Sequence, residues 1–408
     1  MQQWDLQTLF NRGMLEDAIV REELLKDIDS GKTLTIYQGF DPTSPNLHIG
    51  HLLGLRVLRW FQLHGHRVIL LIGDFTGRIG DPSDRPEARK PLTHQQVLDN
   101  ATTYREQFSR IFDLDGENPA EVRMNGDWLD QITLAQFSDI MDKFTVQQLL
   151  ERSMFQERLD KNEALYLNEM IYPVLQAYDS VAMEVDAELG ASDQLFNMMR
   201  GRDLVRSYLG KPKHVLTTPL LPGLDGRKMS KTYGNTVDLT EKPVSMFFKL
   251  TLVNDSALPS FMRVLTDSTE DEIQAVEELM TSEKNLVGER VAFAHKIVSL
   301  LHSADSANDA REEFQRVISE GELPSNIPTL TVPNDSISAE GVNLVNMIAT
   351  SDLVESKSDV RRIIQQGGVS INGSVVEDPR AHIELTSLSG ALLKIGKRGY
   401  LRITSTEQ

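Results

Sequence analysis

The chain has 408 residues and an acidic balance, with 42 Lys and Arg against 60 Asp and Glu. This length is enough for two or three domains, and a net charge of −18 argues against a protein that wraps nucleic acid over its whole surface. The absence of cysteine excludes disulfides, thiol nucleophiles and cysteine-bound zinc.

No segment of the sequence reads as a leader or a membrane anchor. The first residues lack the apolar run of a signal peptide, and acidic residues come too early for a transit peptide. No apolar run approaches the ~18 residues that a membrane span needs. We therefore expect a cytoplasmic protein with no membrane partner.

Residues 1–235 alternate short apolar runs with stretches of helical spacing. Leu34–Tyr37 and Val68–Ile72 are bounded by turn residues, as buried parallel strands are, and Val215–Thr218 resembles a later strand. Four apolar positions between the first two runs keep helical spacing, namely Leu53, Val57, Trp60 and Phe61. Strand, helix, strand is the unit of a Rossmann-like parallel sheet, so the first domain is predicted to be α/β.

A histidine pair opens the predicted helix after the first strand, in His48-Ile49-Gly50-His51. Residues three apart share one face of a helical turn, where imidazole and backbone N–H groups and the helix dipole can bind a polyphosphate. Gly50 allows a flat base to approach the backbone. Asp41 and Thr43 lie in the preceding turn and can reach the same nucleotide. For the pair alone, surface or metal-binding histidines are the alternative.

Two lysines stand in a glycine-flanked segment, Lys228-Met229-Ser230-Lys231-Thr232. A flexible ammonium is a good point charge for a phosphate whose charge changes during a reaction. An ordinary solvated loop is the alternative. Arg85 and Arg89, in a polar loop over 81–91, are either solvated charges or a second phosphate clamp.

A polar stripe runs along an otherwise apolar stretch at Tyr172, Gln176 and Asp179. The spacing puts these side chains on one face of a helix and predicts a pocket for a small polar ligand. Asp81 and Asp193-Gln194 are expected in turns at the rim of the sheet, where a carboxylate can bind a ribose hydroxyl. The alternatives are an ordinary amphipathic helix and turn-forming residues.

The rest of the chain changes character. Residues 236–325 are predicted to be all-helical, residues 326–341 carry prolines, serines and asparagines typical of a linker, and residues 342–408 form a third unit. From residue 343 on, eight Lys and Arg stand against seven Asp and Glu, so the preceding residues hold the acidic excess. This asymmetry makes the third unit the candidate RNA contact.

The two signatures are similar to the HIGH and KMSKS motifs of class I aminoacyl-tRNA synthetases. The surrounding sequence resembles the bacterial-type tyrosyl-tRNA synthetases over nearly the whole chain. This wider likeness lies in Tyr37–Thr43, Gly80–Ser83, Tyr172–Asp179 and Ser192–Gln194. The tail, with Ser358–Val369 and Ile371–Gly373, resembles a ribosomal protein S-four type RNA-binding domain.

The resemblance implies a two-step ligase. It would activate L-tyrosine with ATP, supplied with Mg²⁺ and without a protein-held metal, and then transfer tyrosine to tRNA(Tyr). Residues 1–235 would be catalytic, 236–325 would face the anticodon, and the protein would be a homodimer, with apolar helices between 128 and 165 as a candidate interface.

Residue roles are implied position by position. Tyr37 and Asp179 would bind the substrate phenol, and Gln194 would lie near its carboxylate. The residues implied to hold the α-ammonium are Tyr172, Gln176 and Asp81. Those implied to contact ATP or act on its phosphates are Asp41, Thr43, His48, His51, Asp193, Lys228 and Lys231. Gly50, Arg85 and Arg89 are further candidates for ATP binding from the residues themselves. The candidate RNA-binding residues are Lys357, Arg361, Arg362, Lys397 and Arg398.

Three other functions share parts of this pattern. A tryptophanyl-tRNA synthetase has the same scaffold, but Tyr37 with Asp179 and the RNA-binding tail argue against it. A small-molecule adenylyltransferase shares the histidine signature but not the lysine loop and the two extra domains. A non-catalytic RNA-binding protein on the same scaffold would have lost pocket or loop residues, and this chain keeps them.

Overall fold

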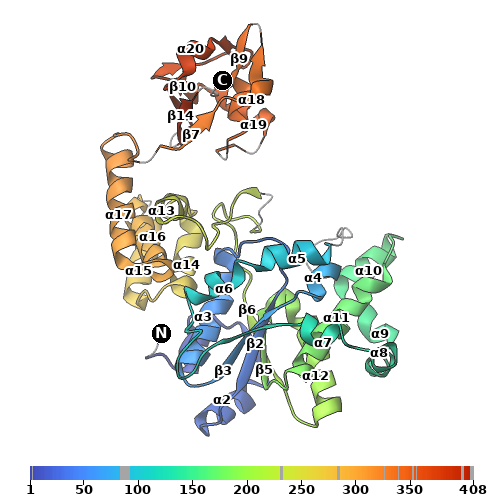
Figure 1. The fold of residues 1–408 in the computed structure, drawn as a ribbon. Coiled ribbons are helices and arrows are strands. Elements are labelled where there is room, and N and C mark those ends of the chain that lie inside the picture. Colours follow the sequence, from blue (N-terminus) through green and yellow to red (C-terminus); the bar gives the residue numbers. More distant parts are fainter. Residues whose placement is uncertain are drawn as a thin grey trace. The chain divides into compact units, whose positions relative to one another are not determined.

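The first part of the molecule is built on a six-stranded sheet (Figure 1). The computed structural model describes residues 1, 3–82, 92–229, 233–282, 285–325, 327–338, 340–351, 353–354, 356–396 and 399–404. The strands, in spatial order, are β1 (Asp17–Ile19), β6 (His214–Thr218), β5 (Ala187–Ala191), β2 (Thr35–Phe40), β3 (Arg67–Ile72) and β4 (Glu121–Met124). β1 pairs antiparallel with β6, and the other neighbours are parallel.

Helices cover both faces of this sheet (Figure 1). α3 (Ile49–Leu63) connects β2 to β3 on one face, and α11 (Leu167–Ala182) and α12 (Leu195–Leu209) pack together on the other. From β2 the chain moves to β3 in one direction, and from β5 it moves to β6 in the other. The order therefore reverses between β2 and β5, and the carboxyl ends of strands at such a reversal form the binding crevice of doubly wound folds.

Shorter helices complete this part of the molecule. They are α1 (Leu6–Asn11), α2 (Arg21–Asp29), α4 (Thr76–Ile79), α5 (His94–Ala101), α6 (Tyr104–Ser109), α7 (Gly126–Leu129), α8 (Leu134–Met141), α9 (Val146–Leu150), α10 (Ser153–Asp160) and the 3-10 turn Ser192–Gln194. Within the described residues, no helix is both long and apolar enough to cross a lipid bilayer.

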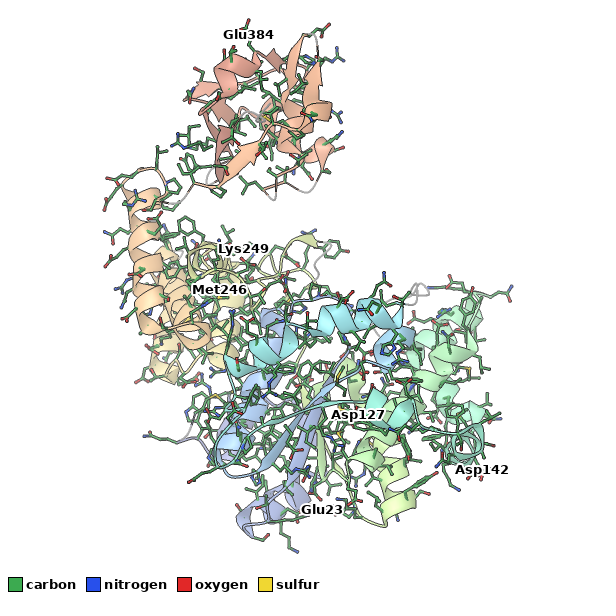
Figure 2. The ribbon with its side chains drawn as sticks, in the orientation of Figure 1. Glu23, Asp127, Asp142, Met246, Lys249 and Glu384 are labelled. Carbon is green, nitrogen blue, oxygen red and sulfur yellow. The ribbon has the colours of Figure 1, made fainter. Side chains whose placement is uncertain are left out.

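The segment after the sheet is helical, as predicted. Its helices are α13 (Pro243–Leu250), α14 (Leu258–Leu265), α15 (Glu270–Thr281), α16 (Val287–Leu301) and α17 (Ala304–Phe314), with a π-turn over Gln315–Ser319. On α13, Met246 is fully buried, whereas the Lys249 ammonium pairs with Glu241 at 2.7 Å (Figure 2). The buried residues of α13 are Met246, Phe247 and Leu250, which have the spacing of one apolar helix face.

The chain divides into two compact units, Met1–Arg311 and Glu312–Gln408. The second unit contains a five-stranded sheet in the order β11-β10-β13-β14-β7 and a three-stranded sheet in the order β12-β9-β8. Its strands are β7 (Thr329–Thr331), β8 (Ile337–Ser338), β9 (Gly341–Asn343), β10 (Val369–Ile371), β11 (Ser374–Val375), β12 (His382–Ile383), β13 (Leu392–Ile395) and β14 (Gly399–Thr404). Its helices are α18 (Leu344–Ile348), α19 (Lys357–Gln365) and α20 (Leu385–Leu388).

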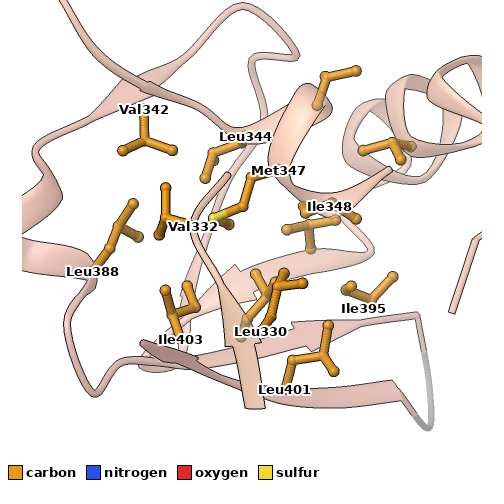
Figure 3. Packing of buried hydrophobic residues seen from close by; sticks show 14 of the residues in the cluster. Leu330, Val332, Val342, Leu344, Met347, Ile348, Leu388, Ile395, Leu401 and Ile403 are labelled. Atoms are coloured by element: carbon orange, nitrogen blue, oxygen red, sulfur yellow. The ribbon is translucent and has the colours of Figure 1, made fainter. Parts of the chain in front are cut away.

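The linker predicted at 326–341 differs from the structure. β7 pairs in parallel with β14, and Leu330 and Val332 belong to the apolar core of the second unit (Figure 3). The sequence did not predict this strand, because an edge strand of three residues gives almost no periodic signal and its neighbours are prolines and small polar residues, which are typical of loops. The helices of residues 243–311 fall in the same compact unit as the six-stranded sheet, Met1–Arg311. A separate helical domain over 236–325 therefore stays a prediction.

Candidate active site

A cavity of about 490 Å³ opens at the carboxyl ends of β2, β5 and β6, where the strand order reverses. Both sequence signatures and most of the predicted pocket residues reach it. The predicted residues that line it are Asp41, Thr43, His48, Gly50, His51, Asp81, Tyr172, Gln176, Asp193, Gln194 and Lys228. The fold thus collects, at one crevice, residues that lie far apart in the sequence.

The side chains of His48 and His51 cap the N-terminus of α3. The Nδ1 atom of His48 accepts a hydrogen bond from the Gly50 N–H at 3.1 Å, and the Nδ1 atom of His51 accepts from the His48 N–H at 3.1 Å. A neutral imidazole that accepts at Nδ1 carries its hydrogen on Nε2. The sequence predicted that backbone N–H groups here would bind phosphate. The N–H groups of Gly50 and His48 instead donate to the two rings. The donors that the rings offer to a ligand are their Nε2–H groups.

Gly50 is where the two signatures meet. A Cβ atom at this position would lie 2.8 Å from the Met229 sulfur and 2.9 Å from Cε1 of His48. A methyl group at this position would therefore displace the Met229 side chain or the His48 ring. Lys228 lines the cavity, whereas Lys231 lies outside the described residues, as do Arg85 and Arg89.

Backbone pairing holds the chain after the lysine loop against the histidine signature. The Ile49 N–H donates to the Val237 carbonyl at 2.8 Å, and the Leu239 N–H donates to the Leu47 carbonyl at 2.8 Å. The Asn46 amide also donates to Asp238 at 2.9 Å. The proximity of the two signatures is thus built into the main chain.

Asp41 lines the cavity and accepts hydrogen bonds from two hydroxyl groups. Its carboxylate accepts from the Tyr172 hydroxyl at 2.9 Å and from the Thr76 hydroxyl at 2.7 Å. Burial raises the pKa of Tyr172 well above its usual value, and the carboxylates of Asp41 and Asp81 act in the same direction. Tyr172 therefore stays a neutral hydrogen-bond donor.

A continuous chain of polar side chains crosses the opposite wall. Asp81 accepts from Gln194 at 2.5 Å and from the buried Arg152 at 3.3 Å. Asn197 donates to both Gln194, at 3.1 Å, and Gln176, at 2.9 Å. Sequence reasoning missed Arg152 and Asn197. Asn197 follows Gln194 by three residues on a helix, which is a spacing that could have indicated it.

Tyr37 and Asp179 lie behind the cavity wall rather than on it, with 1% and 2% of their surfaces exposed. The Tyr37 hydroxyl is 2.8 Å from the Ser180 hydroxyl. The Asp179 carboxylate accepts from the Trp128 indole at 2.8 Å and from the Asn125 amide at 3.2 Å. Burial raises the pKa of Asp179, and these two donors oppose that rise. Burial, with the Glu188 and Asp179 charges, also raises the pKa of Tyr37 well above 10.

The predicted RNA-binding residues belong to the second unit. Lys357, Arg361 and Arg362 lie on α19, where Arg362 donates to Asp359 at 2.9 Å, and all three are exposed. Lys397 and Arg398 lie outside the described residues. No group of three or more His, Asp or Glu side chains that could hold a metal occurs in the part of the chain that the structure describes.

Comparison with known proteins agrees with this geometry. Residues 29–319 match the model of the tRNA synthetases class I (W and Y). The chain therefore belongs to this family, whose members use ATP to activate an amino acid. Residues 325–403 match the model of the tyrosine--tRNA ligase SYY-like C-terminal domain.

Tyrosine--tRNA ligases are among the relatives that match over nearly the whole chain. The ligase of Thermotoga maritima is 39% identical over 393 residues, which cover 96% of this chain and 95% of the relative. The ligase of Aquifex aeolicus is 40% identical over 391 residues, with 95% and 96% covered. Among solved structures, a C-terminally truncated Aspergillus nidulans mitochondrial tyrosyl-tRNA synthetase has a TM-score of 0.64 at 21% identity, covering 76% of this chain and 93% of its own, and shows the fold alone.

Proposed function

We propose that this protein is a tyrosine--tRNA ligase, which forms tyrosyl-adenylate from L-tyrosine and ATP and then charges tRNA(Tyr). One observation carries the proposal. The cavity has the histidine signature and Lys228 on one side and a polar chain suited to an amino acid on the other. The full-length similarity to tyrosine--tRNA ligases and the matching C-terminal model favour tyrosine over tryptophan.

The ATP half of the cavity supplies donors and cations. The Nε2–H groups of His48 and His51 would bind phosphate oxygens, and Gly50 would leave room for the base. Lys228 and Lys231 would stabilise the charge that develops on the leaving pyrophosphate. The other residues proposed here for ATP are Asp41, Thr43, Asp193, Arg85 and Arg89. Mg²⁺ would enter as part of the ATP substrate.

The amino-acid half supplies fixed acceptors. Asp81, Tyr172 and Gln176 would hold the α-ammonium, and Gln194 would lie near the carboxylate that attacks the α-phosphorus. Tyr37 and Asp179 would bind the phenol. Because both residues are buried behind the cavity wall, the substrate ring would have to enter beyond the residues that now line the cavity. The protein contributes positioning and charge stabilisation rather than a covalent nucleophile.

The remaining assignments are proposals at the level of domains. Residues 312–408 form their own compact core and would contact tRNA through α19. The helical segment would face the anticodon, and the protein would act in the cytoplasm as a homodimer.

Amino-acid-dependent exchange of pyrophosphate into ATP tests the proposed function. With tyrosine, phenylalanine and tryptophan run side by side, exchange with tyrosine alone is expected. Exchange with tryptophan would assign the chain to the sister enzyme. No exchange with any of the three, from folded protein, would support a non-catalytic RNA-binding role.

Gly50→Ala should raise the KM for ATP with little change in the KM for tyrosine. The added methyl meets the Met229 side chain and the His48 ring, and it can be accommodated only by moving one of these two groups, both of which line the cavity. Gly288→Ala on α16 is the matched control, because its Cβ would meet nothing within 4 Å and alanine favours helix. An unchanged KM for ATP in Gly50→Ala would contradict the role of this contact.

A further inference from the structure

A fully buried ion pair lies behind the tyrosine half of the cavity. The Lys213 ammonium, which directly precedes β6, contacts the Glu188 carboxylate of β5. Lys213 is 0% exposed and Glu188 is 2% exposed. Burying two charges removes their hydration, and apolar residues of similar volume are often as stable in such a place. Stability alone therefore gives no reason for this pair.

The pair connects to the substrate-facing residues by two branches. On one branch, the Gln176 amide donates to Glu188 at 3.0 Å. On the other, the Lys213 ammonium donates to the Ser180 hydroxyl at 2.9 Å, and Ser180 lies 2.8 Å from the Tyr37 hydroxyl. The first branch ends at a group proposed for the α-ammonium, and the second ends at a group proposed for the phenol.

Gly201 on α12 leaves the space that the cluster occupies. A Cβ atom there would lie 2.4 Å from the Lys213 nitrogen, 3.0 Å from the Ser180 hydroxyl oxygen and 3.2 Å from a Glu188 carboxylate oxygen. The helix thus packs directly on the ion pair, so the ammonium has little freedom to leave its two acceptors.

The single hydrogen of Ser180 decides what Tyr37 can offer to a ligand. The Ser180 hydroxyl has two possible acceptors, Tyr37 at 2.8 Å and Glu188 at 3.4 Å. The Tyr37 hydroxyl also hydrogen-bonds Glu188, so the carboxylate competes for the hydrogens of both hydroxyls. If Ser180 donates to Glu188, the Tyr37 hydrogen goes to Ser180 or to Glu188, and Tyr37 faces the ligand with lone pairs only. If Ser180 donates to Tyr37 and Glu188 is satisfied by another donor, Tyr37 can give its own hydrogen to the ligand.

We propose that Lys213 is a positioning residue that sets this direction. Its ammonium supplies Glu188 with a donor, so the Ser180 hydrogen goes to Tyr37, and Tyr37 donates to the phenolic oxygen of tyrosine. This inference rests on the proposed function, because it requires tyrosine as the ligand. The raised pKa of Tyr37 agrees with it, since Tyr37 then stays protonated and able to donate.

Lys213→Met tests the proposal through the ratio of kcat/KM for tyrosine to kcat/KM for phenylalanine in pyrophosphate exchange. Without the ammonium, Glu188 attracts the Ser180 hydrogen and Tyr37 loses its donor role. The ratio should fall about tenfold or more, as for a lost bond to a buried group. Damage on the Gln176 branch affects both substrates equally, because both carry the same α-ammonium, and cancels in the ratio.

The double variant Lys213→Met, Glu188→Met separates this role from a structural one. Removing the competing carboxylate leaves Tyr37 as the acceptor for Ser180, so the ratio should recover towards wild type although the ion pair is gone. A ratio as low as in the single variant, or a single variant within twofold of wild type, would overturn the proposal. If Lys213→Met alone does not fold, a low ratio in the double variant overturns the proposal.

Arg158→Met is the matched control. Arg158 forms another buried ion pair, with Glu169 at 2.8 Å, and its loss should lower the unfolding temperature without changing the ratio. The wild-type enzyme is measured first. Absence of tyrosine exchange there would refute the proposed function itself, whereas normal exchange with an unchanged ratio in Lys213→Met would refute only the role of Lys213.

Discussion

Asp179→Asn should raise the KM for tyrosine by about 10–100-fold and leave the KM for ATP nearly unchanged. The Asn side chain has the same shape, but only its oxygen can accept a hydrogen bond. Its NH2 group would therefore face the N–H donor of Trp128 or of Asn125, and an unpaired buried polar group costs about 1–3 kcal/mol. Trp128 has only a donor to offer. The Asn125 amide cannot rotate by 180° to offer its oxygen instead without losing two hydrogen bonds, because it also accepts from the Phe75 N–H and donates to Thr76.

The control for this variant is Asp130→Asn. Asp130 pairs with Arg78 at the surface, where removing one charge has little effect on stability and should not affect either KM. The measurement is pyrophosphate exchange at varied tyrosine and varied ATP, with thermal unfolding in parallel. If the KM for ATP rose first in Asp179→Asn, the assignment of this residue to the tyrosine half would be wrong.

A chain ending at Ser319 should keep tyrosine activation within about twofold and lose at least about tenfold in charging of tRNA, because lost cationic contacts weaken binding to phosphates. Ending there keeps α17 and its π-turn, whose Phe314 and Val317 are buried, and removes the whole core of the second unit. A cut at residue 342 would instead separate β7 from β14.

Salt dependence provides the control for the truncation. Charging by the full chain should fall steeply with added salt, and the residual charging by the truncated chain should fall less steeply, because fewer counterions are released. Equal loss of activation and charging in the truncated chain would contradict the assignment of residues 320–408 to tRNA.

The sequence predicted the strands that carry a periodic apolar signal. β2, β3 and β6 lie where the apolar runs are, with shifts of up to three residues at their ends. β1 and β4 were missed because β1 has only three residues and β4 carries charged Glu121 and Arg123. In such short elements, pairing with a neighbouring strand decides the conformation, and local pattern contributes little.

Site residues could be predicted from the sequence where their motif lies on a single helix. The histidine pair and the stripe on α11 depend on local spacing, and the structure brings the histidines, Tyr172 and Gln176 to one crevice, with Asp179 behind its wall. Trp128, Arg152 and Lys213 were not predictable, because each reaches its partner across at least 25 residues of sequence. Those contacts depend on how α7, α10 and β6 pack, which sequence spacing does not determine.

The backbone pairing at Val237 and Leu239 has an entropic consequence. Pro222 forms a bridge with Lys228, the first residue of the lysine signature, and beyond the signature His48 and Asp238 form a bridge that joins the chain to the start of α3. Because both bridges fix the chain close to Lys228, the effective concentration of this lysine at the α3 terminus is high before any nucleotide arrives. Most of the loop-closure entropy is lost during folding rather than in each catalytic cycle.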